Sequence, residues 1–452
     1  MRIIIIGGGS VGAAICAQLA TEHHDITVID TDMAALSEIA NVCDVFGVVG
    51  NGAEVAVQRK AGAERADLLV AVTSNDEMNI LCCAVAKKLG TAHTIARVRN
   101  PEYAELMQLM RSEMGLSLTI NPELATAREI YRMLRFPAAA KIEPLCHGRV
   151  EMAEFVVAPD SPLSGVSLND LRSRLQIKFL VCSVLRAGQA YIPSGDFVIR
   201  EGDVVCVTTP DDAITRFFKA IGGYRQPVRD VLIAGGGRTT YYLEEMLGRG
   251  GIRSTVIEKD RAKCEELAEA FDCNVICDSG IKQERLLEEG IEHTDAFLSL
   301  SSVDEENAIM SMYAKTKNLQ KIVTMIGTMS YVDLFKGVGL ESIVSPKAST
   351  ATYILRYVRS ISNLRDSSEI QSLHKIMDGQ VEALEFAVKE EIAGLTDIPL
   401  MKLSLRKNVL IACIARGGEV LIPTGSDCIR AGDTVVIMTL GGQMKSIKDV
   451  IL

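Results

Sequence analysis

The chain begins with the run Met1-Arg2-Ile3-Ile4-Ile5-Ile6-Gly7-Gly8-Gly9-Ser10-Val11-Gly12. Its first half is apolar and mostly β-branched, which predicts a buried strand that ends at the glycines. An alanine-rich stretch follows, and a second β-branched run then ends at Asp30. Strand, glycine turn, helix and strand in this order predict the first part of a dinucleotide-binding βαβ unit.

The three glycines of this GxGxxG pattern have separate physical roles. Gly7 permits the tight turn, Gly9 lets the backbone approach a pyrophosphate, and Gly12 lets the helix pack closely on the strand. Free N–H groups at the helix N-terminus would hold the anion. Asp30 follows Gly12 by 18 residues, where an acid accepts hydrogen bonds from ribose hydroxyls and repels the 2′-phosphate of NADP. We therefore expect NAD(H) or an adenine nucleotide, and the alternative is a glycine turn that binds nothing.

Composition limits the class of protein. The 452 residues are 48% hydrophobic and 23% charged, which predicts a globular chain of about two to four domains. A net charge of −10 argues against nucleic-acid binding, which needs a basic surface. No apolar run approaches the length of a membrane span, and Met1 begins a strand directly, so we expect a soluble protein without a signal peptide.

The cysteines and histidines predict no metal site. Twelve cysteines are present without a CxxC pair, and Cys273 and Cys277 lack histidines at zinc spacing. A further six lie in apolar segments, which favours buried, reduced thiols: Cys16, Cys82, Cys83, Cys182, Cys206 and Cys413.

The α/β pattern continues after Asp30. Further strands are expected at Val45–Val49, Leu68–Val72 and Thr94–Val98, with a helix at Ile80–Leu89. Strands separated by helices predict a parallel sheet whose carboxyl edge holds the ligand. Arg97 at this edge either meets a phosphate or forms a salt bridge with Asp76 or Glu102. The expected cofactor-binding residues are Gly7, Gly8, Gly9, Ser10, Val11, Gly12, Asp30, Asn51, Thr73, Ser74 and Arg97.

A smaller unit follows the first one. Asn121-Pro122 combines a capping residue with a first-turn proline, which predicts a connecting helix to about Arg135. Beyond it, the pattern predicts a small α+β domain with strands at 153–157, 179–184 and 204–207 and helices at Leu168–Leu175 and Asp211–Ile221.

The whole pattern then repeats. At an offset of 228 residues Gly7 matches Gly235 and Asp30 matches Glu258, and the small domain returns at an offset of 230. The sequence therefore predicts a tandem duplication: two Rossmann-like parallel-sheet domains, each followed by a small α+β domain. The expected segments are a first Rossmann-like domain at 1–120, a connecting helix at 121–140, a small domain at 141–226, a second Rossmann-like domain at 228–344, a connecting helix at 345–366 and a second small domain at 367–452.

The second copy differs at its glycine turn. Thr240 replaces the third glycine, which predicts a poorer helix–strand approach, while Arg238 replaces Ser10 and Met325 replaces Arg97. Either this copy still binds a nucleotide with Arg238 on a phosphate, or Arg238 pairs with nearby carboxylates. The expected residues of this weaker second site are Gly235, Gly236, Gly237, Arg238, Thr239, Glu258, Ser279, Ser301 and Ser302.

Two further motifs have competing interpretations. Pro193-Ser194-Gly195 and Ile199–Asp203 return as Pro423-Thr424-Gly425 and Ile429–Asp433; glycine-supported turns are expected, with a small-ligand or ion pocket as the alternative. Tyr313 and Lys317 have the YxxxK spacing of short-chain dehydrogenases, but the first copy has Val85 and Leu89 there. An NAD-dependent oxidoreductase is therefore the alternative function, and we expect no catalytic residue.

The chain resembles the RCK/KTN family of potassium-transport regulators over essentially its whole length. The resemblance rests on the GGGSVG start, Asp30, the segment Thr73–Asn79 and the two P-S/T-G-x-x-x-I-R-x-G-D elements. It implies a cytosolic subunit that binds NAD(H), with ATP or ADP as further ligands. It also implies self-association into a dimer or tetramer ring and attachment to the cytoplasmic face of the inner membrane. The implied partner is an integral potassium-translocating subunit of the TrkH/TrkG type.

Overall fold

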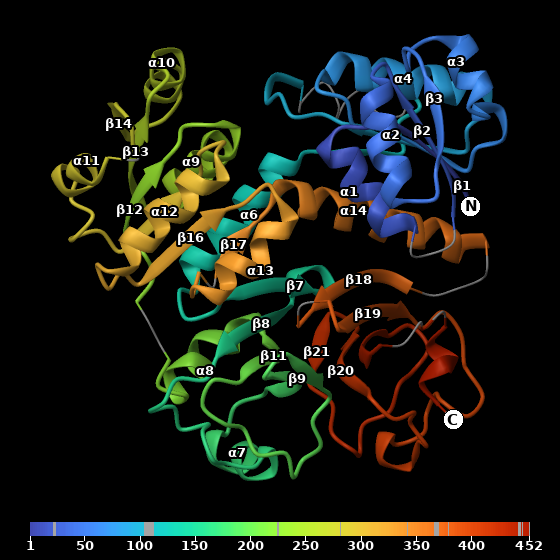
Figure 1. Ribbon diagram of the computed structural model, residues 1–452. Coiled ribbons are helices and arrows are strands. Elements are labelled where there is room, and N and C mark those ends of the chain that lie inside the picture. Colours follow the sequence, from blue (N-terminus) through green and yellow to red (C-terminus); the bar gives the residue numbers. More distant parts are fainter. Residues whose placement is uncertain are drawn as a thin grey trace.

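The computed structural model describes residues 1–20, 24–103, 113–223, 226–280, 282–340, 342–365, 370–377, 379–441, 444 and 446–451. Figure 1 shows four bodies: two α/β lobes side by side above two smaller β-rich lobes. The first α/β lobe (blue) lies over the second small lobe (red), and the second α/β lobe (yellow) lies over the first small lobe (green). Within the described residues, no helix is long and apolar enough to cross a membrane.

The first lobe contains a six-stranded parallel sheet in the order β3-β2-β1-β4-β5-β6. This is the strand order of a dinucleotide-binding fold, with the crevice between β1 and β4. The strands are β1 (Arg2–Ile6), β2 (Asp25–Asp30), β3 (Phe46–Val49), β4 (Leu68–Ala71), β5 (His93–Arg97) and β6 (Leu118–Ile120). The helices are α1 (Ser10–Ala20), α2 (Met33–Val42), α3 (Val55–Lys60) and α4 (Asp76–Leu89).

The second lobe repeats this sheet in the order β14-β13-β12-β15-β16-β17. Its strands are β12 (Asp230–Ala234), β13 (Arg253–Glu258), β14 (Asn274–Cys277), β15 (Ala296–Ser299), β16 (Lys321–Met325) and β17 (Ile343–Val344). Its helices are α9 (Arg238–Gly250), α10 (Arg261–Ala270), α11 (Gln283–Glu288), α12 (Asp304–Lys315) and α13 (Met329–Gly337).

The two small lobes contain antiparallel five-stranded sheets with equivalent strand orders, β10-β9-β11-β8-β7 and β18-β19-β22-β20-β21. The first comprises β7 (Lys141–Leu145), β8 (Val150–Val156), β9 (Leu180–Arg186), β10 (Gln189–Tyr191) and β11 (Val204–Pro210), with helices α7 (Leu168–Leu175) and α8 (Ile214–Ala220). The second comprises β18 (Ile370–Ile376), β19 (Val381–Ala387), β20 (Val409–Arg416), β21 (Glu419–Leu421) and β22 (Thr434–Leu440). The predicted fold class and tandem duplication are confirmed, while the predicted domain limits stay predictions.

Two long helices exchange between the copies. Helix α6 (Pro122–Arg135) follows the first lobe in the chain but packs on α9 of the second, where Ile130 and Leu134 join the second core. Helix α14 (Pro346–Arg365) follows the second lobe but packs on α1 of the first, where Ile354 and Val358 are fully buried. Figure 1 shows α14 (orange) crossing beneath the blue lobe. Each Rossmann-like core is therefore completed by a helix from the other copy.

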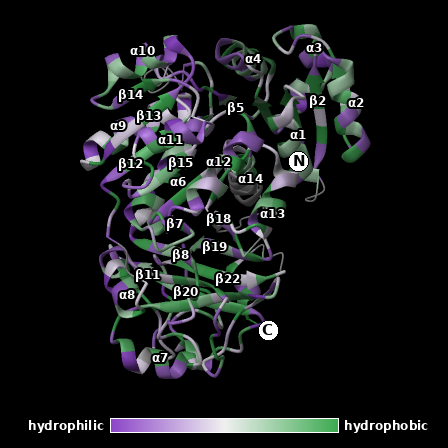
Figure 2. Ribbon diagram, turned by 60° about the vertical axis from the view of Figure 1, so that its left-hand side comes forward, coloured by the Kyte–Doolittle hydropathy of each residue, from purple (hydrophilic) through white to green (hydrophobic). Residues whose placement is uncertain are grey.

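The small sheets also share one core. Apolar side chains of both sheets form a continuous cluster that includes Met152, Cys206, Ala383 and Met438. Figure 2 shows the hydrophobic colouring of β20 and β22 in this region. The Sγ atoms of Cys146 and Cys413, one from each copy, lie 3.8 Å apart within it. Burial of this surface joins the two small lobes into one unit.

Several predicted boundaries were wrong. The helix expected at Asp211–Ile221 begins as a 3₁₀ turn at Asp211–Ala213, and only Ile214–Ala220 is α-helical. Strands β6, β7 and β10 were not predicted; β6 and β10 have only three residues each, and β7 contains Pro144 and charged residues. Such short or polar edge segments give a weak alternation signal.

The repeated glycine elements of the small lobes form turns. Gly202 and Gly432 have φ values of +80° and +90°, as the turn interpretation requires. The following Asp203 accepts two hydrogen bonds from Arg186, at 2.8 and 2.7 Å, and Asp433 accepts equivalent bonds from Arg416. Both carboxylates are therefore occupied by their own sheets.

We expect Ile354→Ala to lower the free energy of unfolding by about 2–5 kcal/mol, because it empties a fully buried site between the copies. Ile309 on α12 is 57% exposed, so Ile309→Ala should change this free energy by less than about 0.5 kcal/mol. Denaturant unfolding of the full chain measures both. Equal effects of the two substitutions would contradict the exchanged-helix packing.

Candidate functional site

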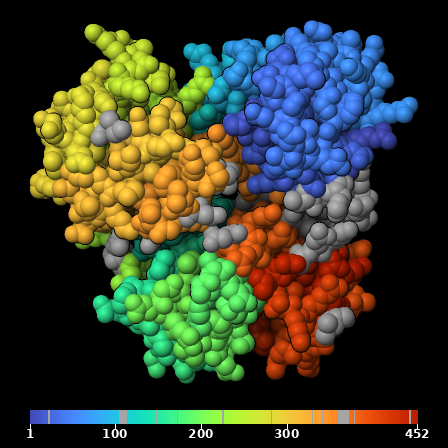
Figure 3. All heavy atoms as spheres, in the orientation of Figure 1, coloured from blue at the N-terminus to red at the C-terminus, as the bar shows by residue number. Residues whose placement is uncertain are grey.

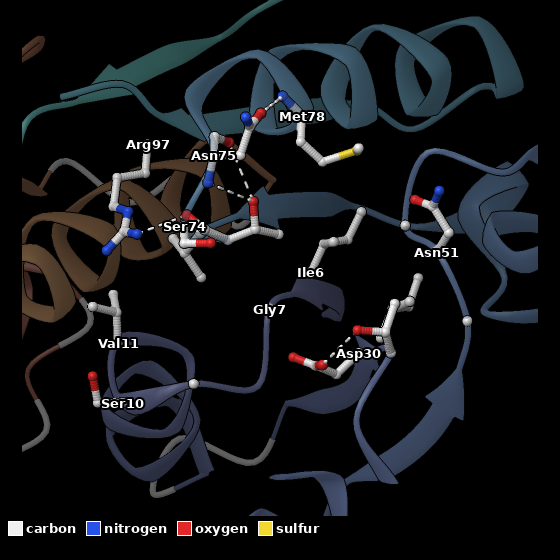
Figure 4. Close-up of a pocket in the computed structure, with 17 residues that line it drawn as sticks. Ile6, Gly7, Ser10, Val11, Asp30, Asn51, Ser74, Asn75, Met78 and Arg97 are labelled. Atoms are coloured by element: carbon white, nitrogen blue, oxygen red, sulfur yellow. Dashed lines mark hydrogen bonds between the residues drawn. The ribbon is translucent and has the colours of Figure 1, made fainter. Parts of the chain in front are cut away.

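The carboxyl edge of the first sheet carries a cavity of about 670 Å³. Figure 4 shows Asp30 and Asn51 on one side of it, with Arg97, Ser74 and Ser10 on the other. Of the residues predicted for this site, those that line the cavity are Gly7, Gly9, Ser10, Val11, Asp30, Asn51, Thr73, Ser74 and Arg97. The structure thus brings nine predicted residues, from five separate segments of the chain, together around one cavity.

Gly8 and Gly12 do not line this cavity but shape its turn. Gly7 has φ +105° and lies against the backbone of Val72 and Thr73. A Cβ atom at Gly12 would lie 1.9 Å from the Gly7 carbonyl oxygen, so any side chain there would displace the helix. A Cβ atom at Gly9 would meet nothing within 4 Å, because Gly9 faces the open cavity.

Asp30 is fixed by the turn that it faces. Its Oδ2 accepts a 2.6 Å hydrogen bond from the N–H of Gly8, and its Oδ1 accepts one of 2.9 Å from the N–H of Asp32. The carboxylate therefore holds the glycine loop against β2 and still borders the cavity. Each carboxylate oxygen has a second lone pair, so the geometry leaves acceptor capacity for a ribose hydroxyl.

The loop after β4 is held by Asn79. Its Oδ1 accepts hydrogen bonds from the N–H and the hydroxyl of Thr73, at 2.8 and 2.7 Å, and its Nδ2 donates to the carbonyl of Arg97 at 2.9 Å. In the second copy Asn307 makes the equivalent bonds to Ser301 N–H and to Met325 O, at 2.9 and 2.8 Å. The carboxyl ends of β4 and β5 in the first copy, and those of β15 and β16 in the second, are thereby joined.

Arg97 was expected either to meet a phosphate or to form a salt bridge with Asp76 or Glu102; within the described residues it forms no such salt bridge, so the second alternative was wrong. Arg97 instead donates a 2.6 Å hydrogen bond to the carbonyl of Thr73 and borders the cavity. Asp76 is engaged by Arg99, through Nε at 3.5 Å and the backbone N–H at 2.7 Å. Burial, followed by the charge of Arg99, lowers the pKa of Arg97. A cation that is partly desolvated in this way favours an anionic ligand.

The cavity also contains residues that were not predicted as ligand-binding. They lie beside predicted positions on the same loops, and their side chains carry no motif of their own: Ile6, Ile29, Thr31, Gly50, Gly52, Val72, Asn75 and Met78. Met78 at the start of α4 follows the cap Asn75, whose side chain accepts from the Met78 N–H. A polar cap at the start of the helix that follows β4 is the signal that would have indicated this wall.

The second lobe carries a cavity of about 510 Å³ at the equivalent edge. Of the predicted second-site residues, those that line it are Gly235, Gly237, Arg238, Thr239, Glu258, Ser279, Ser301 and Ser302. Gly236 instead donates a 2.6 Å hydrogen bond to Glu258, as Gly8 does to Asp30. Five charged residues were not predicted here: Arg99 and Glu123 from the first copy, and Lys259, Lys263 and Glu306 from the second.

Thr240 does not abolish the turn. Gly235 keeps a φ of +108°, close to that of Gly7, and the Thr240 hydroxyl donates a 2.6 Å hydrogen bond to the Gly235 carbonyl. In the first copy the Gly7 carbonyl lies close to Gly12, which has no side chain. In the second copy the Thr240 side chain lies at the equivalent place and is accommodated by this hydrogen bond. Arg238 forms no ion pair within the described residues, so the alternative of pairing with nearby carboxylates was wrong.

The YxxxK pair lies outside both glycine-loop cavities. Lys317 forms a 2.7 Å ion pair with Glu292 and lies over the ring of Tyr313. Both contacts are those of a helix surface.

No group of three or more His, Cys, Asp or Glu residues in the described part has metal-binding geometry. The six cysteines predicted to be buried thiols are buried and free.

Fold and site together define a tandem protein with two Rossmann-like domains, each with a cavity at the carboxyl edge of its parallel sheet. The TrkA-N domain family matches residues 3–122 and 231–346, and the TrkA-C domain family matches residues 152–222. The chain is 32% identical over its full length to the full-length Trk system potassium uptake protein TrkA homolog of Archaeoglobus fulgidus. It is 31% identical to the TrkA protein of Halomonas elongata, over 100% of this chain and 98% of that one. The chain belongs to the TrkA family of potassium uptake proteins.

Solved structures share the fold. The structure described as the GsuK RCK domain has a TM-score of 0.65 at 16% identity and covers 97% of this chain and 92% of that one. The structure described as the GsuK channel bound to NAD has a TM-score of 0.64 at 17% identity, over 97% of this chain and 77% of that one. At this identity the likeness concerns the fold alone.

We expect Gly12→Ala to destabilise the chain by about 1–3 kcal/mol, because the methyl group overlaps the Gly7 carbonyl. Gly9→Ala is the matched control, since its methyl group meets nothing in the ligand-free protein. Thermal unfolding without nucleotide should therefore leave the midpoint of Gly9→Ala near that of the wild type. A loss of stability in Gly9→Ala equal to that in Gly12→Ala would contradict this geometry.

Proposed function

We propose that this protein is the nucleotide-sensing regulatory subunit of a potassium uptake system and binds NAD(H) in its first cavity. The observation that carries the proposal is the first glycine loop: an open Gly9, an ordered Asp30 and an arginine border one space at a sheet edge. These groups suit a pyrophosphate and a ribose with a free 2′-hydroxyl.

The comparisons support the regulatory part of the proposal. Its TrkA relatives match end to end and are described as potassium uptake proteins. GsuK structures are described as bound to NAD and to ADP, so ADP or ATP is a further ligand to test here. Binding alone can regulate a partner when the ligand has different affinities for two conformations, and no bond need be broken. We therefore favour a regulator over an NAD-dependent oxidoreductase.

The proposed partner is an integral membrane subunit of the TrkH/TrkG type that carries the potassium ions. The protein would bind it at the cytoplasmic face of the inner membrane, as a dimer or tetramer ring of this chain. Nucleotide occupancy would then move the lobes of the ring as rigid bodies and change the state of the membrane subunit.

The cofactor assignment is tested by NADH fluorescence titration of the full chain. We expect Gly9→Ala to weaken NADH binding at least tenfold, because the methyl group occupies the space that the pyrophosphate needs. NADPH should bind the wild type at least tenfold more weakly than NADH, because Asp30 repels a 2′-phosphate. Unchanged NADH affinity in Gly9→Ala would remove the first glycine loop from the site.

The assembly is tested by light scattering on the purified chain, with and without NADH and ATP. We expect a mass of two or four chains and a change in mass or hydrodynamic radius when nucleotide is added. A monomer under every condition would contradict the ring assembly, while leaving the cofactor titration to decide the nucleotide site by itself.

A further inference from the structure

A third cavity, of about 370 Å³, lies where the two exchanged helices meet the small sheets. Its walls come from α6, β7 and β8 of the first copy and from α13, α14 and β18 of the second. Figure 1 shows β7 and β18 beneath these helices. Figure 3 shows the surface hollowed between the second α/β lobe (yellow and orange) and the first small lobe (green). Within the described residues, this cavity shares no lining residue with either glycine-loop cavity.

The cavity lies where equivalent positions of the two copies touch. Glu143 on β7 pairs in register with Met152, and His374 on β18 pairs with Ala383 at the equivalent place of the second small sheet. The Nδ1 atom of His374 lies 3.2 Å from Oε2 of Glu143. The axis that relates the two small lobes therefore passes close to this contact. Because the two equivalent residues differ in charge, the cavity beside them is asymmetric.

The carboxylates of this cavity are largely neutralised by their neighbours. Glu143 forms a 3.4 Å ion pair with Lys141 in addition to its contact with His374. Burial acts against the charge of Lys141, but Glu143 and Glu154 outweigh it and raise the pKa of Lys141. Burial also raises the pKa of Glu129, which favours the neutral form of this acid. These acids would therefore repel an anion in the cavity only weakly.

Three cations of the cavity form no ion pair within the described residues: Arg128 and Arg132 on α6, and Lys375 on β18. Arg128 and Arg132 are four residues apart, so they share one face of α6, with Cβ atoms about 6 Å apart. The Nε atom of Arg132 is buried without a hydrogen-bond partner. A buried donor of this kind costs free energy, which an anionic acceptor in the cavity would recover.

The geometry of these cations favours a phosphate group over a carboxylate. Guanidinium groups bind phosphate through two parallel N–H donors, and a phosphate has enough oxygens to accept from two such groups at once. The cavity is larger than inorganic phosphate alone requires, and its volume is within the range of about 300–1,000 Å³ that is usual for small organic ligands. Its wall also includes apolar side chains such as Met133 and Val332. The remainder of the ligand is therefore a small organic group.

We propose that this cavity binds a phosphate monoester of a small organic molecule. The phosphate is held by Arg128 and Arg132 of the first copy and by Lys375 of the second. The bound ligand joins α6, which connects the first Rossmann-like lobe to its small lobe, to the small sheet of the other copy. The site does not depend on the proposed function, since neither glycine loop takes part in it.

The site is tested by calorimetric titration of the full chain with glycerol 3-phosphate, in a buffer without phosphate or sulfate. We expect a dissociation constant below about 1 mM, and no binding of glycerol, which lacks the phosphate. Arg128→Ala and Arg132→Ala should each weaken binding at least tenfold. Arg132→Lys should weaken it only several-fold, because it keeps the charge but not the two parallel donors. Lys375→Ala, at an exposed position, should also weaken it several-fold.

Arg174→Ala is the matched control, since Arg174 is exposed on α7, forms no ion pair within the described residues and lies outside the cavity. Its affinity for glycerol 3-phosphate should equal that of the wild type. Absence of binding in the wild type overturns the proposed site, as does wild-type affinity in both Arg128→Ala and Arg132→Ala. Inorganic phosphate that binds as tightly as glycerol 3-phosphate would overturn the monoester assignment.

The link between the copies is tested by thermal unfolding of the full chain. Saturating glycerol 3-phosphate should raise the unfolding midpoint of the wild type and of Arg174→Ala, because a ligand that binds only the folded state stabilises it. The midpoints of Arg128→Ala and Arg132→Ala without ligand show whether these variants fold, and the ligand should leave them unchanged. An equal rise in all four proteins would place the bound phosphate elsewhere and contradict the proposal.

Discussion

The exchange of α6 and α14 between the copies is the contact on which the rest of the structure depends. Each helix buries its apolar face in the Rossmann-like core of the other copy. Removal of so many fully buried aliphatic side chains from water contributes many kcal/mol, at roughly 25 cal/mol per Å². Neither lobe has a complete core without the other copy, so the duplicated chain folds as an internal pair. The glycine loops are consequently fixed near the helices that begin at Pro122 and Pro346.

Much of the fold follows from local patterns in the sequence. Buried β-branched runs, caps such as Asn121 and a constant repeat offset are sufficient for the two parallel sheets and the duplication. The partner of α6 could not be predicted, because an amphipathic helix shows which face is buried but not what covers it. The short strands β6 and β10 could not be predicted either, since three residues carry almost no periodic signal.

The loops that form the candidate site could be predicted from the sequence. The contacts of its charged side chains could not. Positions at the carboxyl ends of parallel strands converge for topological reasons, and this places Gly9, Asp30 and Ser74 together. Arg97 and Arg99 are only two residues apart, and spacing alone does not say which one faces Asp76. In the structure Arg99 engages Asp76 and reaches the other copy. The second cavity contains residues of the first copy, which no pattern within one repeat can reveal.

We propose that a nucleotide bound at the first glycine loop controls potassium uptake. The most direct measurement is potassium flux through the membrane subunit in vesicles, with this chain added in the presence and absence of NADH. We expect NADH to change the flux with the wild type and to have no effect with Gly9→Ala, whose added methyl group meets nothing in the ligand-free protein. A flux that responds equally to NADH with both proteins, or with neither, would contradict it.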